Sequence, residues 1–382
     1  MSKRVLAIGV GGTGKAALTI LKERLEETYG MVPDNVVLLS LDTDNLRPED
    51  VFAGSRLTDQ FDKRNREPEF RYVVSKSGVT LDTVFRDIAN QRSSAYMYWL
   101  ESKKLDLILA PAERDIRGGA QQRRPIGRVA VFQRWDNPIY SSIMQGIARM
   151  YGEPDENPNQ NIDAVKMEQS KRLIFIIGSV AGGTGSGFLV DIANLVRHAV
   201  SANTRFQSVD VSAIIVLPDA FSSYTSAMND PTNLKPNSYA ALREMDRFIR
   251  TNSANLPYMV RYDDDLRSIT WNTKQTVDHV YLVDTASPSG VGDSDLSGNP
   301  WRGVFPIISD FVMAHVDESM GDSLATLRSN AGQQYNKEEG WQYSAFNLMT
   351  YIFPVEDVIK SFSFRFLREM ITRQFLPIAD KK

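Results

Sequence analysis

The sequence contains no cysteine and only three histidines among its 382 residues. Without cysteine, the protein cannot form disulfides, thiolate-metal sites or a cysteine nucleophile. The histidines stand far apart, at His198, His279 and His315, so a histidine-rich metal site would need partners that the sequence does not show. We therefore expect no metal bound directly by protein side chains, and the lack of cysteine suits an intracellular protein.

The sequence also lacks a large excess of either charge sign, and it lacks long apolar runs. The 44 Lys and Arg residues oppose 47 Asp and Glu residues, for a formal net charge of -3. No global field therefore attracts nucleic acid or anionic lipid. No uninterrupted apolar run approaches the roughly 20 residues that cross a bilayer, and the N-terminal run is too short for a signal peptide. With 42% hydrophobic residues, the composition predicts a soluble, cytoplasmic, globular protein with a sizeable core, without nucleic-acid binding or direct membrane insertion.

The sequence does contain a regular alternation of short apolar runs and amphipathic stretches. The runs predict buried strands, and the stretches predict helices. Predicted strands lie within 5–10, 35–45, 172–178, 209–217, 277–284 and 345–353, and predicted helices at about 15–27, 80–90, 188–200, 237–252, 303–328 and 355–375. Strands that alternate with helices predict a doubly wound, mostly parallel α/β sheet with right-handed crossovers.

The first glycine-rich segment, IGVGGTGKAAL at 8–18, follows the first predicted strand. Its glycines fit the dinucleotide-binding pattern G-x-G-x-x-G. With Lys15, they also fit a P-loop, except that Ala16 stands where a Mg²⁺-binding Ser or Thr is needed. This segment alone therefore leaves both interpretations open.

A second glycine-rich segment, AGGTGSG at 181–187, lies between another strong strand pattern and another strong helix pattern. Backbone N–H groups at a helix N-terminus can bind an anion, and glycine lets the backbone approach phosphate oxygens closely. The hydroxyls of Thr184 and Ser186 can add hydrogen bonds. Because a dinucleotide-binding domain needs only one such turn, two segments at the ends of neighbouring strands predict that both bind one polyphosphate.

AGGTGSG matches the signature loop of the tubulin superfamily, and three further segments strengthen this resemblance. The superfamily's second loop is similar to Asp42–Asn45, and its third, glycine-containing loop resembles RGGAQQRRPIGRVA at 117–130. Its base-recognising asparagine and aromatic residue resemble Asn237 and Tyr239 in KPNSYAALREM. Over about residues 3–285, the chain thus resembles a divergent bacterial tubulin-like GTPase, related to the bacterial cell-division homologue of tubulin.

The resemblance implies that the chain binds GTP or GDP, with Mg²⁺. It implies that Gly11, Gly12 and Thr13 contact the α- and β-phosphates, and that the signature loop contacts the β- and γ-phosphates. Asp44 is expected to reach Mg²⁺ through water or to touch the nucleotide. The complete set of implied nucleotide-binding residues is Gly11, Gly12, Thr13, Asp44, Asn45, Gly118, Gly119, Ala120, Gly182, Gly183, Thr184, Gly185, Ser186, Asn237 and Tyr239.

Several side chains near these loops have ordinary structural interpretations as well. Lys15 could contact phosphate as a point charge, but the resemblance implies no such lysine, so we favour a lysine on the helix surface. Arg123 and Arg124 either neutralise charge on the γ-phosphate, as an arginine finger does, or form a solvated loop pair or a contact to the next subunit. Asn237 either binds the base or is the N-cap of its helix.

Hydrolysis in the tubulin superfamily is completed by the next subunit of a filament, whose acidic loop positions the attacking water. On this resemblance, Glu356 and Asp357 are the catalytic candidates, because they open the last predicted helix, and Asp317 and Glu318 compete with them. Carboxylates in a first helical turn are also ordinary complements of the helix dipole.

We expect residues 1–328 to form the GTP-binding domain, with an insertion at about 49–104 and a long central helix at 303–328. Residues 329–382 then begin a C-terminal domain or form a reduced one. The preferred function is a slow GTPase that self-associates head to tail into filaments, with nucleotide at the subunit interface. A non-polymerising nucleotide-binding scaffold is the alternative. A Rossmann NAD-dependent oxidoreductase is a third interpretation, based on Asp42 after the second strand, but it leaves the second glycine-rich segment unexplained.

Overall fold

The chain falls into two compact units, Met1–Phe346 and Asn347–Lys382. The computed structural model describes residues 3–43, 69–73, 81–90, 99–100, 120, 122–151, 172–202, 209–221, 231–250, 258–262, 268–271, 276–284, 303–317, 320–321, 323–324, 326–327, 343–346 and 355–375. Of the elements in these described residues, the sheet and almost all of the helices belong to the first unit, and one helix belongs to the second.

The first unit is built around a seven-stranded sheet with the order β3-β2-β1-β4-β5-β8-β9. All of its neighbouring strands are parallel. The strands are β1 (Arg4–Val10), β2 (Val36–Asp42), β3 (Glu69–Val73), β4 (Arg172–Ser179), β5 (Val209–Val216), β8 (His279–Val283) and β9 (Tyr343–Ser344), while β6 (Tyr258–Arg261) and β7 (Ser268–Trp271) form a separate antiparallel pair. The strand order reverses between β1 and β4, which creates the kind of switch point where α/β folds bind ligands.

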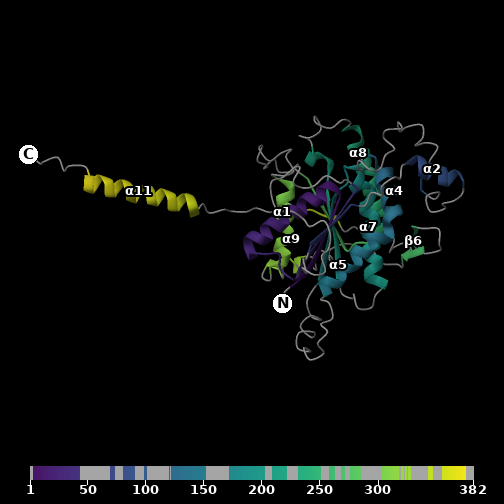
Figure 1. The fold of residues 1–382 in the computed structure, drawn as a ribbon, viewed down its shortest axis with the longest axis horizontal. Coiled ribbons are helices and arrows are strands. Elements are labelled where there is room, and N and C mark those ends of the chain that lie inside the picture. Colours follow the sequence, from purple (N-terminus) through teal and green to yellow (C-terminus); the bar gives the residue numbers. More distant parts are fainter. Residues whose placement is uncertain are drawn as a thin grey trace, which may run out of the picture. The chain divides into compact units, whose positions relative to one another are not determined.

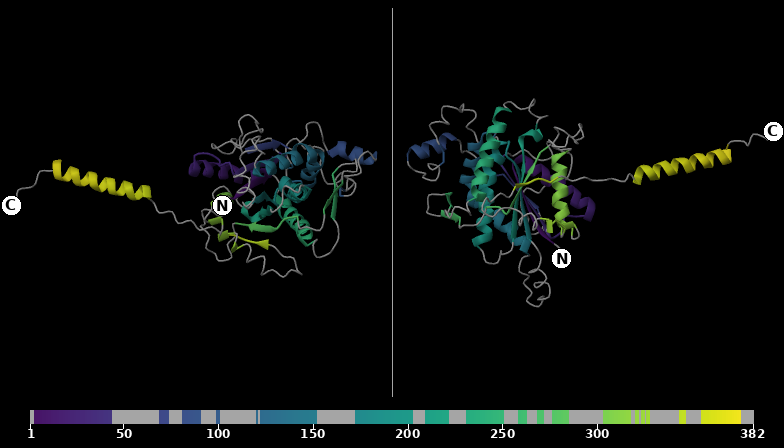
Figure 2. Two further views of the ribbon diagram at one scale, coloured as in Figure 1. Left: turned by 90° about the horizontal axis from the view of Figure 1, so that it is seen from below. Right: turned by 180° about the vertical axis from the view of Figure 1, so that it is seen from behind.

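Helices cover both faces of this sheet, so the predicted doubly wound α/β fold is confirmed (Figures 1 and 2). Helices α1 and α9 pack together on one face, and α4, α5 and α7 lie on the other. The helices are α1 (Gly11–Tyr29), α2 (Leu81–Ala89), α4 (Arg124–Arg134), the π-helical segment η4 (Trp135–Tyr140), α5 (Ser141–Tyr151), α7 (Gly183–Ala202), the 3-10 turn η7 (Pro231–Asn233), α8 (Leu234–Arg250), α9 (Val304–Val316) and α11 (Val355–Phe375).

The central strands are buried on both faces, which explains why they are continuous apolar runs in the sequence. Val5, Leu6, Ala7 and Ile8 of β1 all have 0% exposure. Leu6 and Ile8 belong to the main core cluster, together with apolar side chains of α4, α5 and α7. Val5 and Ala7 alternate with Leu6 and Ile8 along β1 and so point to the opposite face of the sheet. They are buried as well, because α1 and α9 cover that face. This packing fixes the position of the sheet's carboxyl edge.

Three predicted boundaries differ from the structure. Helix α1 begins at Gly11 rather than near residue 15, so the first glycine-rich segment is itself the first helical turn. Helix α9 ends at Val316, because Asp317 is extended with φ -65° and ψ 133°, and the described residues between 320 and 327 are helical again. The predicted single helix at 303–328 is therefore wrong only in its continuity, because it is interrupted at Asp317. The predicted insertion at 49–104 contains β3, which extends the sheet beside β2.

The second unit contains α11, at the position of the predicted closing helix. Its side chains from 359 to 372 are exposed. The predicted strand at 345–353 lies mostly outside the described residues, and the two described positions, Ala345 and Phe346, belong to neither a strand nor a helix.

Candidate functional site

Two helices begin side by side at the carboxyl edge of the sheet. Strands β1 and β4 are parallel neighbours, with Val10 aligned to Gly178. Helix α1 starts directly after β1, and α7 starts at Gly183, four residues after Ser179, the last residue of β4. Neither first turn contains an acidic residue, and the N-cap of α1, Val10, makes no side-chain cap. The backbone N–H groups and dipoles at both starts therefore favour an anion at this edge.

Four segments of the chain meet at Thr184 in the second glycine-rich loop. The hydroxyl oxygens of Thr184 and Thr43 are 2.6 Å apart. The backbone N–H of Ala120 donates to the Thr43 hydroxyl at 3.2 Å. A Cβ placed on Gly11, whose φ is +69°, would lie 3.2 Å from Cβ of Thr184. The structure therefore brings Gly11, Ala120 and Thr184 together, although these predicted residues lie far apart in the sequence.

The glycines of the two loops have two different environments. A Cβ on Gly183 would lie 2.6 Å from the backbone N of Arg123 and 2.7 Å from the carbonyl oxygen of Ala120, so this glycine is required by packing. A Cβ on Gly12 or Gly182 would meet no atom of the described residues within 4 Å. Gly12 and Gly182 therefore face open space, and a ligand at the edge can approach their backbone closely.

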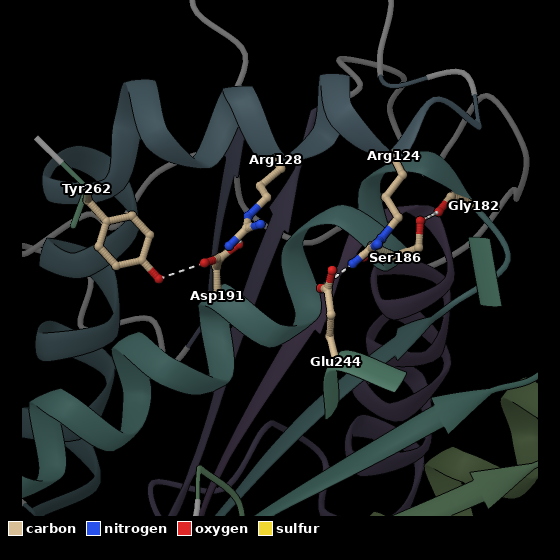
Figure 3. A network of polar contacts seen from close by, with 7 residues as sticks. All are labelled: Arg124, Arg128, Gly182, Ser186, Asp191, Glu244 and Tyr262. Carbon is tan, nitrogen blue, oxygen red and sulfur yellow. Dashed lines mark hydrogen bonds and ion pairs between the residues drawn. The ribbon is translucent and has the colours of Figure 1, made fainter. Parts of the chain in front are cut away.

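Helix α4 holds the second glycine-rich loop through Arg124 (Figure 3). The Arg124 guanidinium donates from Nε to the carbonyl oxygen of Ser186 at 2.8 Å and forms an ion pair with Glu244 of α8. Its side chain is only 18% exposed. The interpretation of Arg124 as half of a solvated loop pair is therefore wrong. Arg124 connects the loop to two neighbouring helices.

One turn further along α4, Arg128 pairs with a buried carboxylate of α7 (Figure 3). Its Nε lies 3.1 Å from Oδ2 of Asp191, and the Tyr262 hydroxyl donates to Oδ1 of Asp191 at 2.8 Å. The guanidinium also lies over the rings of Trp99 and Phe132. Burial raises the pKa of Asp191, although Arg128 and the Tyr262 hydrogen bond act in the opposite direction. The group is a structural connection between α4 and α7.

Lys15 is buried, which corrects our expectation of a lysine on the helix surface. Its residue exposure is 8%, and its Nζ lies 3.2 Å from Oδ2 of Asp42. Asp42 is the last residue of β2 and is 2% exposed. Each charge is therefore neutralised by the other at the carboxyl edge of the sheet.

Asn237 and Tyr239 lie on different sides of α8. Asn237 is 9% exposed, and its Nδ2 donates to the carbonyl oxygens of Gln122 at 2.9 Å and Ala181 at 3.3 Å. Tyr239 is 65% exposed, and its hydroxyl accepts a hydrogen bond from Arg243. Helix residues two apart do not share a face, so the structure does not bring these two predicted residues together. Because α8 begins at Leu234, Asn237 lies inside the first turn, and its interpretation as the N-cap is wrong.

Ser186 differs from the other residues of its loop. Its hydroxyl donates to the carbonyl oxygen of Gly182 at 2.5 Å, and its N–H donates to the same oxygen at 3.1 Å. Both donors of Ser186 are thus directed into α7 rather than toward the open edge. These two hydrogen bonds leave Ser186 poorly placed for the predicted phosphate contact.

Several predicted site residues lie outside the described part of the chain. They are Asp44, Asn45, Gly118, Gly119 and Glu318. Glu356 and Asp357 stand in the first turn of α11, but their side chains are not among the described ones. Asp317 is described, and its Oδ1 accepts the N–H of Met320.

Two properties concern the described residues taken together. No group of three or more His, Asp and Glu side chains there is arranged to hold a metal ion. None of the described helices combines the length and the apolar character needed to cross a membrane.

A family model described as tubulin-like matches residues 6–372. Among solved structures, the chain is similar to CetZ2 from Haloferax volcanii in a GTPγS-bound protofilament, with a TM-score of 0.41 and 13% identity over 85% of this chain and 63% of that chain. It is also similar to CetZ from Methanosaeta thermophila, with a TM-score of 0.39 and 16% identity over 86% and 59% of the two chains. A third similar structure is the GTPγS-form protofilament of TubZ from Bacillus thuringiensis serovar israelensis, with a TM-score of 0.39 and 14% identity over 83% and 57%.

The chain spans less than two thirds of each of these three structures, between 57% and 63% of their length. No curated protein sequence matches the chain.

Proposed function

The chain belongs to the tubulin-like family, and from this premise we propose that it is a GTP-binding protein that hydrolyses GTP slowly and self-associates head to tail. The nucleotide lies at the contact between subunits. The observation that carries the proposal is the meeting of Gly11, Thr43, Ala120 and Thr184 at the carboxyl edge, where α1 and α7 both begin.

Phosphate binding in this proposal uses the two open glycines and the two helix starts. The N–H groups of Gly11, Gly12 and Thr13 bind the α- and β-phosphates, because they belong to the first turn of α1 and have no intrahelical acceptor. The loop of α7 binds the β- and γ-phosphates through its own first N–H groups and the Thr184 hydroxyl. Ala120 adds the third segment, and the proposal includes Gly118, Gly119, Asp44 and Asn45, which neighbour Ala120 and Thr43 in the sequence.

Base selection in this proposal depends on Asn237. Both hydrogens of its amide are donated to backbone carbonyl oxygens, so only its Oδ1 is left to bind a base, and this atom is an acceptor. Guanine presents two donors together, N1–H and the 2-amino group, which match an acceptor. Tyr239 stays a separate prediction, because its ring lies on the other side of α8.

Mg²⁺ prefers oxygen ligands and keeps several of its waters, binding through few protein groups and the phosphates of its nucleotide. The hydroxyl oxygens of Thr43 and Thr184 are the described oxygens at the junction that fit this chemistry. The ion would supply charge neutralisation of the phosphates. Asp42 is less suitable as a ligand, because its carboxylate is paired with Lys15.

Hydrolysis in this proposal needs a carboxylate from a second copy of the chain. Among the described residues at the edge, Asp42 is buried and paired, so it is poorly placed to orient an attacking water. We assign this role in trans to Glu356 and Asp357, and Asp317 with Glu318 is the competing pair. The pairing of Asp42 also weakens the oxidoreductase interpretation, which needs this carboxylate free for a ribose hydroxyl.

The first experiment identifies the nucleotide that the purified protein retains. The protein is heat-denatured, and the released compounds are separated by anion-exchange chromatography against GTP, GDP, ATP and NAD standards. We expect GDP or GTP. Release of only NAD, or tight NADH binding that GTP does not compete, overturns the proposal in favour of the oxidoreductase.

The second experiment tests hydrolysis in trans by mixing two defective variants. Gly12→Val is expected to lose nucleotide binding, and the double variant Glu356→Gln with Asp357→Asn is expected to bind nucleotide without hydrolysing it. Because each variant supplies the part that the other lacks, their mixture should regain part of the turnover, and wild-type turnover per subunit should rise with protein concentration. Turnover that is independent of concentration, with nucleotide still bound, favours the non-polymerising scaffold. The variant with Asp317→Asn and Glu318→Gln is the comparison for the competing pair.

A further inference from the structure

We propose that Lys15 and Asp42 form a positioning pair that sets the charge of the nucleotide edge. Lys15 neutralises Asp42, and this allows a triphosphate to bind beside a buried carboxylate. The inference rests on the proposed function, because it concerns the same edge, but it assigns a role to two residues outside the proposed set of nucleotide-binding residues.

The geometry of α1 places the Lys15 ammonium near this edge. Lys15 stands four residues after Gly11, which is about one helical turn. Helical side chains point back toward the N-terminus of their helix, so the side chain of Lys15 extends toward the strand ends. There its Nζ lies 3.2 Å from Oδ2 of Asp42, and the two side chains are only 10% and 3% exposed.

Asp42 directly precedes the residue at which the loops meet. Thr43 is 0% exposed, and its hydroxyl contacts that of Thr184 and accepts the N–H of Ala120. Consecutive Cα atoms are about 3.8 Å apart, so Asp42 lies at the same strand end as this junction, with its side chain on the face of the sheet that α1 covers. The first turns of α1 and α7 contain no acidic residue, which makes Asp42 an exception in its surroundings.

An unpaired carboxylate at this position would oppose phosphate binding. Like charges at the same strand end repel, and at the effective dielectric constant of about 20 that suits protein sites this repulsion weakens binding. The buried carboxylate would also be unfavourable by itself, since removing one partner of a buried pair leaves an uncompensated charge. The Lys15 ammonium removes both effects, because it is held on Asp42.

The pair makes two predictions that a purely structural lysine does not make. Loss of Lys15 should weaken GTP binding more than GDP binding, because the γ-phosphate adds negative charge that the buried, no longer neutralised Asp42 carboxylate repels. Loss of both charges should restore binding, because no carboxylate is then left to neutralise. A lysine that contacts phosphate directly would give no such restoration.

The test measures the affinities of Lys15→Met, Asp42→Asn and the double variant for fluorescent GTP and GDP analogues. We expect Lys15→Met to lose about tenfold or more in GTP affinity, with a smaller loss for GDP, and the double variant to return to within about threefold of wild type. Lys22→Met is the matched control. Lys22 also lies in α1, is 9% exposed and is paired with Glu26, but it lies two turns further from the edge, so its affinities should equal those of wild type.

The inference is overturned if the double variant binds GTP as weakly as Lys15→Met, or if Lys15→Met binds like wild type. Circular dichroism at the assay temperature establishes that each variant is folded. If Lys15→Met does not fold, Asp42→Asn decides by itself, because it should bind GTP as well as wild type or better, and a loss of more than tenfold contradicts the inference. Failure of the wild-type protein to bind GTP at all is a different result, which contradicts the proposed function.

Discussion

The two glycine-rich starts of α1 and α7 look alike in the sequence but are supported very differently. The start of α7 is held by the backbone at Ala120 and Arg123, by the Arg124 guanidinium and by the Asn237 amide. The start of α1 is a local turn that touches α7 mainly where Gly11 meets Thr184. The second loop is therefore a frame held by contacts with α4 and α8, and the first is a short strand-to-helix turn placed against it.

The largest expected effect comes from breaking the connection between α4 and α7 at Arg128. Arg128→Met leaves the Asp191 carboxylate buried without its ion-pair partner, so we expect a loss of about 3 to 5 kcal/mol in the free energy of unfolding. Urea denaturation followed by circular dichroism measures it. In the double variant with Asp191→Leu no buried charge is left, and most of the loss should disappear. If that variant is as unstable as Arg128→Met, the ion pair is not the cause.

Gly183→Val tests the backbone packing of the same frame. Its side chain would collide with the backbone of Ala120 and Arg123, so we expect a loss of about 1 to 3 kcal/mol in the free energy of unfolding. Gly182→Val is the matched control, because its side chain meets open space and the stability without ligand should change little. Equal losses in the two variants would contradict the distinction between packed and open glycines.

Gly12→Val tests whether the open space at the start of α1 is where the nucleotide binds. The added side chain fits the apo structure, since no described atom lies within 4 Å of its Cβ, but it fills the space that we assign to phosphate. We expect unchanged thermal stability without nucleotide and a loss of at least about tenfold in GTP affinity, or roughly 1.4 kcal/mol. Gly30→Asn, at the far end of α1, is the control, because Asn tolerates the left-handed backbone there. Wild-type affinity in Gly12→Val would place the nucleotide elsewhere.

The smallest effect is expected for Glu244→Gln. Glu244 pairs with Arg124, but its side chain is 38% exposed, so solvent screens the interaction. We expect a loss of no more than about 1 kcal/mol in the free energy of unfolding. Arg124→Met, which also removes the hydrogen bond to the Ser186 carbonyl, should cost more. If Glu244→Gln lost more free energy of unfolding than Arg124→Met, the contact of Arg124 with α8 would matter more for stability than its hydrogen bond to α7.

The sequence predicted most of the fold because its main signals are local. The apolar runs of β1 and β4 and the glycines directly after them specify a strand, a turn and a helix whatever surrounds them. Predictions failed where a local pattern was ambiguous. The helical pattern after Val304 continues in the sequence past Val316, but Asp317 adopts an extended backbone and ends α9. The strand β3 lies in a charged segment, EFRYV, whose short alternation is a weak signal.

Side-chain roles at the site were harder to predict, because they depend on which partners the fold brings together. Lys15 looked like a surface lysine, since nothing in α1 shows that Asp42 lies beside it. Asn237 looked like an N-cap or a base ligand, but its amide joins two loops that are 115 and 56 residues away. Only one feature of the sequence indicated that Thr43 belongs to the site, namely its position directly after a buried strand.

By itself, the sequence determined the alternating strands and helices, the glycines at two helix starts and a balance of charge that gives the surface no overall field. These properties depend on residues close together in the chain, whose preferences add up within one strand or one turn. Only the tertiary structure decided that Gly11, Thr43, Ala120 and Thr184 meet at one edge, that Arg124 fixes a loop and that Lys15 is buried on Asp42. Those contacts join residues far apart in the chain, and they exist only because parallel pairing of β2, β1 and β4 places three strand ends side by side.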